Sequence, residues 1–480
     1  MISESSATNP DLIFYGINNQ NQLLRINTQS PNTTLSTISI TGLVANDRIT
    51  NIDFRPTTGQ LYGISSGNQL YVIDEVTGVA RAVGNPLITP ATGSITSLEM
   101  NPALDTVRAI TNTGGNLRVN PNTGAIINTD ASVDPSLGTS VAFNNNLAGA
   151  SPTSLFIIDT TNDRLLRQNP PSDLTITSIG SGFGVDITNA CGFDIAPNGV
   201  GILCGIVGGV SRLFLIDLNS GIITRTLGNL PQPLESLAIP TAPVAYAIVI
   251  SNNNLMIINS IDGALSFNTK SITGLQAGES IVGLDIRPAN GQLVGLGSTS
   301  RLYSLNGATA EATAIGAGTP FTPALSGTTF GFDFNPTVDR IRVVSNTGQN
   351  LRLNPDTGGL AAQDTNLNPG TPSITSVAYT NNVGNASTTQ LFDIDSTSDR
   401  LLLQNPPNAG TLVDIGPLGI DVDANNGFDI GGRSGTALAL LTVSGITSVY
   451  QINLATGAAT SVANTTFPAA CRAYTLGLSV

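Results

Sequence analysis

The stretch ITNIDFRPTTGQLYGISSGNQLYVIDEVTGVARAVG, residues 49–84, decides the fold class of this chain. It contains four apolar segments of strand length, NIDF, LYGIS, QLYVID and VARAVG, which are rich in Ile, Val, Leu and Tyr. The breaks between them, RPTTG, SSGN and EVTG, supply the Gly, Pro, Asn and Asp that tight turns need. Four short strands joined by tight turns predict an antiparallel meander of the kind that forms one blade of a β-propeller.

Units of this kind recur about every 47 residues, which is typical of propeller blades. In the first half of the chain they start near residues 12, 49, 94, 138 and 187. The second half repeats the first, because NTGGNLRVNPNTG (112–124) returns as NTGQNLRLNPDTG (346–358). No segment shows the period of 3.6 residues that an amphipathic helix requires. We therefore predict an all-β chain made of two copies of about 235 residues each.

The ends of the two copies indicate how each copy closes. The first unit opens directly at LIFYGINN (12–19), without an inner strand, and spare strands end the copies at ESLAI (235–239) and RAYTLGL (472–478). Pairing the last strand into the first blade would leave no sheet edge exposed. We predict two tandem five-bladed β-propellers of four-stranded antiparallel blades, with one ten-bladed propeller as the alternative. The predicted parts are an N-terminal tail (1–11), a first propeller copy (12–239), a linker (240–243) and a second propeller copy (244–480).

Charge and composition exclude several classes of function. The formal net charge of −13 argues against nucleic acid and against anionic membrane surfaces as partners. No apolar run approaches the roughly 18 residues of a membrane span, so membrane insertion is not expected. With no His and only three Cys, the chain lacks the residues for Ser-His-Asp catalysis and for common zinc sites. We expect no cofactor, with calcium as the one ion that the acidic residues would suit.

Several motifs resemble those of a known family. The phrases NTGxNLRxNPxTG, NPxxDxxR and DxTxDRLLxQNPP, each present in both copies, are similar to those of a family of bacterial domains of unknown function. That family occurs mostly in predicted secreted or surface proteins, as single or tandem copies, and the resemblance covers nearly the whole chain. It implies an extracellular or cell-surface location and no particular activity. The opening MISESSATNPD lacks the features of a signal peptide, so a cytosolic location is the alternative.

The inner-strand register places one set of acidic residues where a propeller would have its central channel. Three oxygen donors in each copy, together with water, would suit a hard cation such as calcium. The other interpretation is structural, in which each acid bonds backbone N–H groups of a neighbouring blade or pairs with an Arg. As ligand or cation candidates we take Asp53, Glu99 and Asp194 in the first copy and Asp285, Asp333 and Asp429 in the second.

A second acidic set lies in the turns DTTNDR (159–164) and DSTSDR (395–400). Clustered oxygens in a tight loop could bind calcium, although the spacing lacks the Gly and distal Glu of a recognised calcium loop. A hairpin turn capped by Asp side chains explains the motif equally well. The calcium candidates in this set are Asp159, Asp163, Asp393, Asp395 and Asp399.

Matched Arg residues and two cysteines complete the candidates. Arg55, Arg108 and Arg164 recur in the second copy, and an acid stands near each in the sequence, namely Asp53, Asp105 and Asp163. We expect these guanidinium groups to bridge neighbouring blades through bidentate ion pairs. Cys191 and Cys204 flank a turn and could form a disulfide in an oxidising compartment.

Three functions fit these observations. The preferred one is a non-enzymatic extracellular or cell-surface propeller that serves as a rigid scaffold or binding module for a protein or glycan partner. A structural subunit of a surface layer, formed by self-assembly, is an alternative. A carbohydrate-active hydrolase or lyase using the inner acids is the third, although no carboxylate is distinguished as a catalytic acid and the chain has no Trp for stacking on a sugar.

Overall fold

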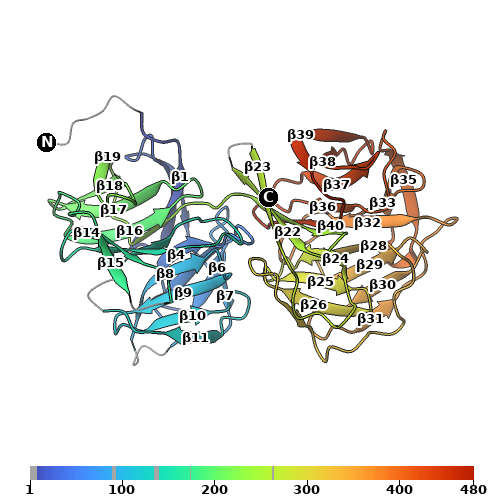
Figure 1. The fold of residues 1–480 in the computed structure, drawn as a ribbon, viewed down its shortest axis with the longest axis horizontal. Helices are drawn as coiled ribbons and strands as arrows, with labels where there is room; N and C mark the ends of the chain where they lie inside the picture. The colour runs from blue at the N-terminus through green and yellow to red at the C-terminus, as the bar shows by residue number, and fades with distance from the viewer. Residues whose placement is uncertain (1–7, 89–92, 135–139, 173–174, 262–263) are drawn as a thin grey trace. The chain divides into compact units, whose positions relative to one another are not determined.

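The computed structural model describes residues 8–88, 93–134, 140–172, 175–261 and 264–480. The chain separates into two compact units, which we call unit 1 (residues 1–242) and unit 2 (residues 243–480). The described residues form ten four-stranded antiparallel sheets, five in each unit (Figure 1). The prediction of an all-β chain built from four-stranded units is confirmed, and the sheets are consistent with propeller blades. Of the expected N-terminal tail (1–11), residues 1–7 lie outside the described residues.

Unit 1 contains sheets 1 to 5, numbered here along the chain and given with their strands in spatial order. Sheet 1 is β20 (Ser236–Ala238), β1 (Ile13–Ile17), β2 (Gln22–Asn27) and β3 (Thr34–Ser39). Sheet 2 is β4 (Ile49–Phe54), β5 (Leu61–Ser65), β6 (Leu70–Ile73) and β7 (Ala80–Val83). Sheet 3 is β8 (Ile95–Asn101), β9 (Thr106–Thr111), β10 (Asn116–Val119) and β11 (Ile126–Asp130). Sheet 4 is β12 (Val141–Phe143), β13 (Leu155–Asp159), β14 (Arg164–Gln168) and β15 (Ile176–Ile179), and sheet 5 is β16 (Asn189–Ile195), β17 (Gly201–Val207), β18 (Val210–Ile216) and β19 (Ile223–Asn229).

Unit 2 contains sheets 6 to 10 in the same arrangement. Sheet 6 is β40 (Cys471–Leu476), β21 (Val244–Val249), β22 (Leu255–Ile261) and β23 (Ala264–Lys270). Sheet 7 is β24 (Ile281–Ile286), β25 (Leu293–Gly297), β26 (Arg301–Leu305) and β27 (Ala312–Ala314). Sheet 8 is β28 (Phe330–Asn335), β29 (Arg340–Ser345), β30 (Asn350–Leu353) and β31 (Leu360–Gln363). Sheet 9 is β32 (Ile374–Tyr379), β33 (Leu391–Asp395), β34 (Arg400–Gln404) and β35 (Leu412–Pro417), with the short 3-10 helix η2 (Pro407–Ala409) before β35, and sheet 10 is β36 (Gly427–Ile430), β37 (Ala437–Val443), β38 (Ile446–Ile452) and β39 (Ala459–Phe467).

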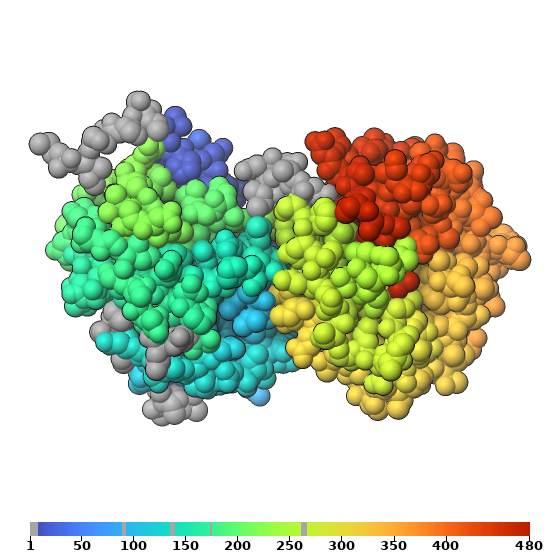
Figure 2. All heavy atoms as spheres, viewed as in Figure 1, coloured from blue at the N-terminus to red at the C-terminus, as the bar shows by residue number. Residues whose placement is uncertain are grey.

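The last strand of each unit pairs into the first sheet of that unit. In unit 1, β20 lies antiparallel to β1, with Ala238 opposite Tyr15. In unit 2, β40 lies antiparallel to β21, with Thr475 opposite Tyr246. The spare strands that the sequence predicted at 235–239 and 472–478 therefore complete the first sheet of their own copy. In Figure 2 the colour of unit 2 passes from yellow-green through yellow and orange to red, so its sheets follow one another around the unit in chain order.

Tight turns with side-chain caps separate the strands. The Oδ1 atom of Asp74 accepts the backbone N–H groups of Val76 and Thr77 at 2.9 and 2.8 Å, which closes the turn between β6 and β7. Gly78 follows at a φ of 75°. A Cβ atom at this glycine would lie 2.4 Å from the carbonyl oxygen of Ser39, so only glycine fits where the turn meets sheet 1. The repeated Asp/Asn-x-Thr-Gly phrases are thus turn chemistry, as the sequence predicted.

Apolar side chains fill the spaces between consecutive sheets. Tyr62 and Ile64 of β5 pack in one buried cluster with Leu98 and Met100 of β8, the first strand of the next sheet. The first strand of a sheet is therefore covered on both faces. For this reason its sequence is apolar along most of its length and does not alternate strictly between apolar and polar residues. Among the described residues no helix is long and apolar enough to cross a bilayer.

Candidate functional site

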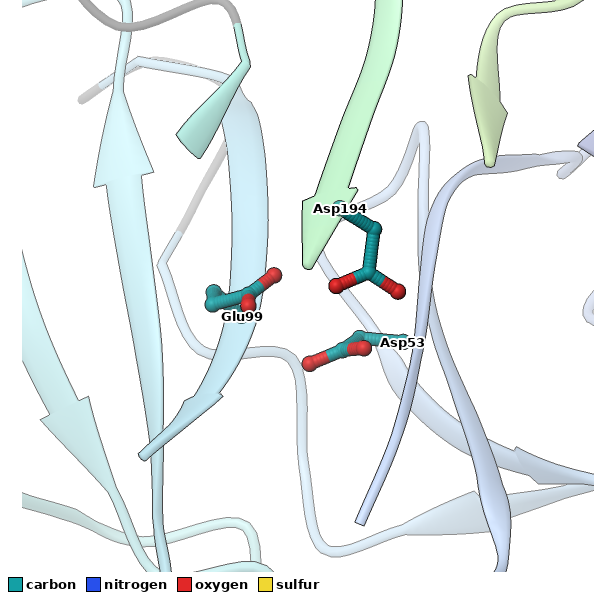
Figure 3. A group of neighbouring side chains, drawn as sticks. All are labelled: Asp53, Glu99 and Asp194. Atoms are coloured by element: carbon teal, nitrogen blue, oxygen red, sulfur yellow. The ribbon is translucent and has the colours of Figure 1, made fainter. Parts of the chain in front are cut away.

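The first acidic trio consists of Asp53, Glu99 and Asp194, which lie on β4, β8 and β16, the first strands of sheets 2, 3 and 5. The three side chains point toward one another from these strands (Figure 3). One carboxylate oxygen from each lies within 4.8 Å of the others, and the residues are 1%, 3% and 1% exposed. The structure therefore brings together the three acids of the first copy that the sequence singled out.

The second acidic trio repeats this geometry in unit 2. Asp285, Asp333 and Asp429 lie on β24, β28 and β36, and their oxygens also meet within 4.8 Å. All three residues are buried. Among the described residues, these two trios are the only groups of three acids whose oxygens lie this close together. Their matching positions in the two copies are therefore enough to identify them.

Each carboxylate of the first trio bonds the backbone of the next sheet. Asp53 Oδ2 accepts the N–H of Met100 at 2.6 Å, and Glu99 Oε1 accepts the N–H of Phe143 at 2.9 Å. Asp194 Oδ2 accepts the N–H of Ile239 at 2.6 Å, just beyond β20. Each bond therefore joins the first strand of one sheet to the first strand, or its extension, of a neighbouring sheet.

Unit 2 has the same three bonds between sheets. Asp285 Oδ2 accepts the N–H of Phe334 at 2.8 Å, and Asp333 Oδ1 accepts the N–H of Tyr379 at 3.1 Å. Asp429 Oδ2 accepts the N–H of Leu476 at 2.7 Å. These bonds favour the structural interpretation of the acids, in which a carboxylate fastens one sheet to the next.

Thr475 is a member of the second site that sequence reasoning missed. It stands on β40 at the register position that Ala238 occupies on β20. Its hydroxyl oxygen lies 2.8 Å from Asp285 Oδ1 and 3.1 Å from Asp429 Oδ2, and its single proton is donated to one of the two at a time. Its signal in the sequence is the alignment of the two closing strands, which places Thr475 opposite Tyr246 where unit 1 has Ala238 opposite Tyr15.

Burial and mutual repulsion raise the pKa values of the trio carboxyls. Burial raises the pKa of Asp194 to about 7 and that of Asp429 to about 6. Burial, with the nearby charge of Asp194, raises the pKa of Asp53 well above its usual range. For Glu99, burial acts together with the charges of Asp53 and Asp194, and a hydrogen bond to Asp53 raises its pKa further. A shared proton between neighbouring carboxyls is the expected result near neutral pH.

The same arrangement is able to bind a hard cation, which needs several oxygen donors. In the first trio, however, five of the six carboxylate oxygens already accept a backbone N–H, the remaining one being Glu99 Oε2. A cation would compete with those bonds, although each oxygen has a second lone pair. The structural use of the trios is therefore visible in the hydrogen bonds, and cation binding stays a prediction.

The turn acids of the second set act mainly as caps. Asp159 Oδ1 accepts two backbone N–H groups of its own turn, both at 3.1 Å, and its Oδ2 accepts the Nε–H of Arg164 at 2.8 Å. Asp395 Oδ1 caps the matching turn of unit 2 through bonds of 2.9 and 3.2 Å. Asp163 and Asp399 instead bond the loop before the next sheet, by accepting N–H groups at 2.9 Å in both units. The structure does not gather these residues into a group of three ligands.

Asp393 differs from the other candidates because it has no hydrogen-bond partner. It is 0% exposed, and neither of its carboxylate oxygens is bonded within the described part of the chain. Val377 and Leu402 lie opposite it on the neighbouring strands, and unit 1 has Ile157 at the same position. Burial raises the pKa of Asp393 well above its usual range, and the nearby charge of Arg342 only partly opposes this.

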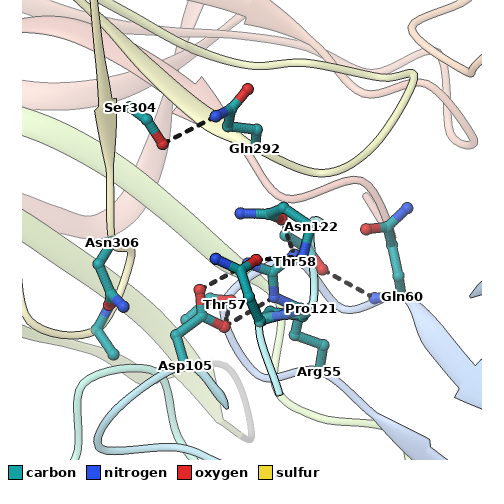
Figure 4. A network of polar contacts seen from close by, with 12 residues as sticks. Arg55, Thr57, Thr58, Gln60, Asp105, Pro121, Asn122, Gln292, Ser304 and Asn306 are labelled. Atoms are coloured by element: carbon teal, nitrogen blue, oxygen red, sulfur yellow. Dashed lines mark hydrogen bonds and ion pairs between the residues drawn. The ribbon is translucent and has the colours of Figure 1, made fainter. Parts of the chain in front are cut away.

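Buried ion pairs join neighbouring sheets, as the sequence predicted, but with different partners. Arg55 contacts Asp105 through two bonds, Nε to Oδ1 at 2.7 Å and Nη2 to Oδ2 at 2.6 Å, which link the end of β4 to the turn between β8 and β9 (Figure 4). Thr57 also donates to Asp105, at 2.6 Å. Asp53, the acid nearest to Arg55 in sequence, does not pair with it: Asp53 bonds the backbone N–H groups of Phe54 and Met100, whereas Arg55, which follows the end of β4, reaches the turn after β8.

The other matched Arg residues also pair within the framework. Arg108, which is 2% exposed, bonds Asp130 at 2.7 Å, and Arg118 bonds the same carboxylate at 2.5 Å. In unit 2, Arg342 and Arg352 share Asp364 in the same way. Arg118, the centre of the phrase NTGGNLRVNPNTG, is therefore part of a cluster within sheet 3.

All three cysteines are free and buried. Cys191 and Cys204 lie within hydrogen-bonding range of each other, and this contact lowers the pKa of Cys191 and raises that of Cys204. Cys204 Sγ also lies 3.6 Å from Ser211 Oγ. A disulfide between Cys191 and Cys204 stays a prediction.

Comparisons with known proteins add a family and one distant structure. The model of a family described as "Domain of unknown function (DUF4394)" matches the chain twice, at residues 22–238 and 254–473. No curated protein matches the chain. Among solved structures, one of PorZ, a bacterial surface component of the type-IX secretion system of Porphyromonas gingivalis, matches with 11% identity and a TM-score of 0.26. The match covers 93% of this chain but 65% of that chain, and a similarity of this size assigns neither a fold nor a function.

Proposed function

The chain belongs to the family of DUF4394 domains and carries two copies of the domain, and we propose that it is a non-enzymatic scaffold and binding module of the cell surface or extracellular space. In this proposal each copy is a closed five-bladed propeller, and its outer surface presents a binding site for a protein partner. The observation that carries the proposal is that the carboxylates of both acidic trios accept backbone N–H groups of a neighbouring sheet, and so hold the sheets together.

Contacts between first strands support closure of each copy. In unit 1, β4 contacts β8, β8 contacts β12, β12 contacts β16, and both β16 and β4 contact β20. In unit 2, β24, β28, β32, β36 and β40 form the corresponding series, and β40 contacts both β36 and β24. Since β20 and β40 belong to the first sheet of their own unit, two rings of five are favoured over one ring of ten.

The inner acids and arginines support a scaffold rather than a catalyst. A glycosidase needs one carboxyl as an acid and another as a nucleophile or base, both in contact with the sugar. Here the trio residues are buried and bond backbone N–H groups, and Arg55 and Arg108 are 2% exposed within ion pairs. Groups of this kind stabilise the fold. Recognition of a partner is then expected from the exposed loops.

An aliphatic patch on unit 1 supports a protein partner. Val44, Val76 and Val79 are 64%, 67% and 53% exposed. They belong to adjacent segments, because Thr41 pairs with Val79 in an isolated bridge between the loop after β3 and the turn before β7. Exposed aliphatic side chains on adjacent segments suit a protein interface better than a sugar-binding site, which usually offers aromatic rings.

The two alternatives predict different observations. A structural subunit of a surface layer would self-assemble into ordered polymers of the purified chain. A carbohydrate-active enzyme would release sugar products and lose activity when the trio acids are replaced. A surface or extracellular location is common to all three functions and distinguishes them from a cytosolic protein.

The proposal is tested by cross-linking the protein in its native cells and identifying the partners by mass spectrometry. The variant V44Q/V79E carries the residues that unit 2 has at these positions, Gln276 and Glu311. We expect a surface location, and a defined set of cross-linked proteins that the variant loses. The control I127E alters an aliphatic residue of unit 1 that is 55% exposed but lies outside the patch, and it should keep the partners. A cytosolic location, or partners retained by V44Q/V79E, would overturn the proposal.

A further inference from the structure

A cavity of about 310 Å³, open to solvent on one side, lies in unit 2 between its first and last sheets. Its walls come from six strands, together with Pro243 and Val480. They include Val244, Ala245 and Ile258 from sheet 6, Leu438, Val449, Val462, Ala463 and Thr465 from sheet 10, and Tyr474 and Leu476 from β40. A volume of this size is within the range of small-molecule sites, which is about 300–1,000 Å³.

Unit 1 fills the corresponding space with its own side chains. The pairing of Tyr15 with Ala238 and of Tyr246 with Thr475 aligns the two first sheets, so Phe14 of unit 1 corresponds to Ala245 of unit 2. Phe14 is 0% exposed and belongs to the apolar cluster between sheets 1 and 5. Replacement of a phenyl ring by a methyl group is therefore one origin of the cavity in unit 2.

The N-terminal segment covers the same gap in unit 1. Asn9 Nδ2 donates to the carbonyl oxygens of Thr28 at 3.0 Å and Leu227 at 3.1 Å, and so bridges sheet 1 and sheet 5. By the same alignment, Asn9 corresponds to Pro240, which belongs to unit 1. Unit 2 thus has the gap without the segment that bridges it in unit 1.

A wide bulge in β39 widens the gap further. In unit 2, Ser448 pairs with Thr466 and Tyr450 pairs with Ser461, so the four residues 462–465 stand opposite the single residue Val449. At the matching place in β19 of unit 1 only Leu227 is extra, between Thr226 and Gly228. The longer bulge supplies part of the cavity wall rather than a side chain that fills it.

The lining of the cavity defines the chemistry of an occupant. Aliphatic groups make up most of it, and none of the described lining side chains is charged. Tyr474 is 5% exposed, and its hydroxyl has no hydrogen-bond partner among the described residues. Thr465 is already bonded, since it donates to the carbonyl oxygen of Val462 at 2.7 Å. This hydroxyl is not among the fully buried atoms that lack a partner, so it is accessible, and an occupant that bonds it would replace a bond to water.

We propose that this cavity of unit 2 binds a small uncharged ligand, a largely apolar molecule with one hydrogen-bonding group that pairs with the hydroxyl of Tyr474. In unit 1 the chain itself supplies the equivalent occupant, an apolar ring from Phe14 and the polar amide of Asn9. The site lies wholly within unit 2 and does not depend on the aliphatic patch of unit 1, so it stands whether or not that patch binds a protein.

The test uses the full chain and the probe 2-naphthol, whose fluorescence is easily followed because the chain has no Trp. We expect saturable binding with a dissociation constant on the order of 100 µM. Naphthalene, which lacks the hydroxyl, should bind more weakly than 2-naphthol. The variant Y474F should weaken binding of 2-naphthol by about fivefold and leave that of naphthalene unchanged, as expected for the loss of one hydrogen bond.

The variant A245F fills the cavity as unit 1 does, and should abolish binding of both probes without lowering the melting temperature. Should A245F fail to fold, the methyl NMR signals of Ala245 and Ala463 in the unaltered protein answer the same question. They should shift on addition of 2-naphthol, whereas the signals of unit 1 should not. Absence of saturable binding up to 1 mM probe, undiminished binding in A245F, or shifts confined to other residues would overturn the proposal.

Discussion

Unit 1 has Phe14 and Ile157 at the positions where unit 2 has Ala245 and Asp393, although the two units contain the same five sheets in the same order. The bonds that join one sheet to the next are repeated in both units, including the three carboxylate-to-backbone bonds of each trio. Differences are found in the side chains that fill the spaces between sheets. The two units therefore share one framework of bonds between sheets. At a smaller set of positions, unit 2 has a cavity or a buried acid where unit 1 has a packed apolar side chain.

The largest difference in stability is expected at the ion pairs between sheets. In unit 1 the side chains of Arg55 and Asp105 are 3% and 5% exposed, whereas those of Arg287 and Asp339 in unit 2 are 10% and 34% exposed. The variant R55M leaves a buried carboxylate unpaired and should lower the free energy of unfolding by about 3–5 kcal/mol. The variant R287M should cost about 1 kcal/mol, because water reaches its partner. Urea denaturation of the full chain measures both.

A double variant controls for the loss of packing around Arg55. R55M/D105L removes both charges, and it should recover most of the stability that R55M loses. Equal losses in R55M and R287M would contradict the difference between the two units.

The next effect concerns the trios. Replacement of Asp53 by Asn leaves one oxygen where two accept backbone N–H groups, those of Phe54 and Met100. We expect a loss of about 1–3 kcal/mol, with a similar loss for D285N in unit 2. Differential scanning calorimetry would show both, and unchanged transitions would count against the fastening role.

Asp393 should give an effect of the opposite sign. The variant D393I carries the residue of unit 1, and it should raise the free energy of unfolding near neutral pH by about 2 kcal/mol, because a buried carboxyl without a partner is lost. Its pKa is raised in the folded state, so the native protein holds a proton that the unfolded chain releases. The contribution of this group to stability is therefore largest at acid pH and declines as the pH rises above the usual range of an Asp carboxyl.

Denaturation at several pH values tests that dependence. The unaltered chain should lose stability from about pH 4 upward more steeply than D393I does. The control I157V in unit 1 should leave the pH profile unchanged. Identical pH profiles for D393I and the unaltered chain would show that Asp393 does not titrate differently on folding.

The smallest effect is expected from calcium. The trio oxygens already accept backbone N–H groups, so addition of calcium or of a chelator should shift the melting temperature by no more than about 1 °C. A rise of several degrees with calcium, absent in D53N or D285N, would instead support the cation site.

The sequence predicted the framework because local signals and global fold agree. Turn residues and short apolar runs mark the strands, and the repeat marks the sheets. It could not predict partners that are set by distance in space: Arg55 pairs with Asp105, which lies 50 residues further along the chain, and not with the acid nearest to it in sequence. Nor could motif reasoning separate Asp393, which is alone in an apolar cluster, from Asp395, which caps its turn. Thr475 was not predicted, because only carboxylates were expected at this site and the residue that completes it carries a hydroxyl.

Native-state hydrogen exchange of the amides bonded to the trios tests the central claim most directly. In the unaltered chain the N–H groups of Met100, Ile239 and Phe334 should exchange only through opening of the whole unit, with protection close to the global stability. In D53N the amide of Met100 should lose protection well beyond the global loss, while that of Phe334 in unit 2 keeps it. Rapid exchange of these amides in the unaltered chain, or equal protection of Met100 in D53N, would contradict the role of the carboxylates as fasteners between sheets.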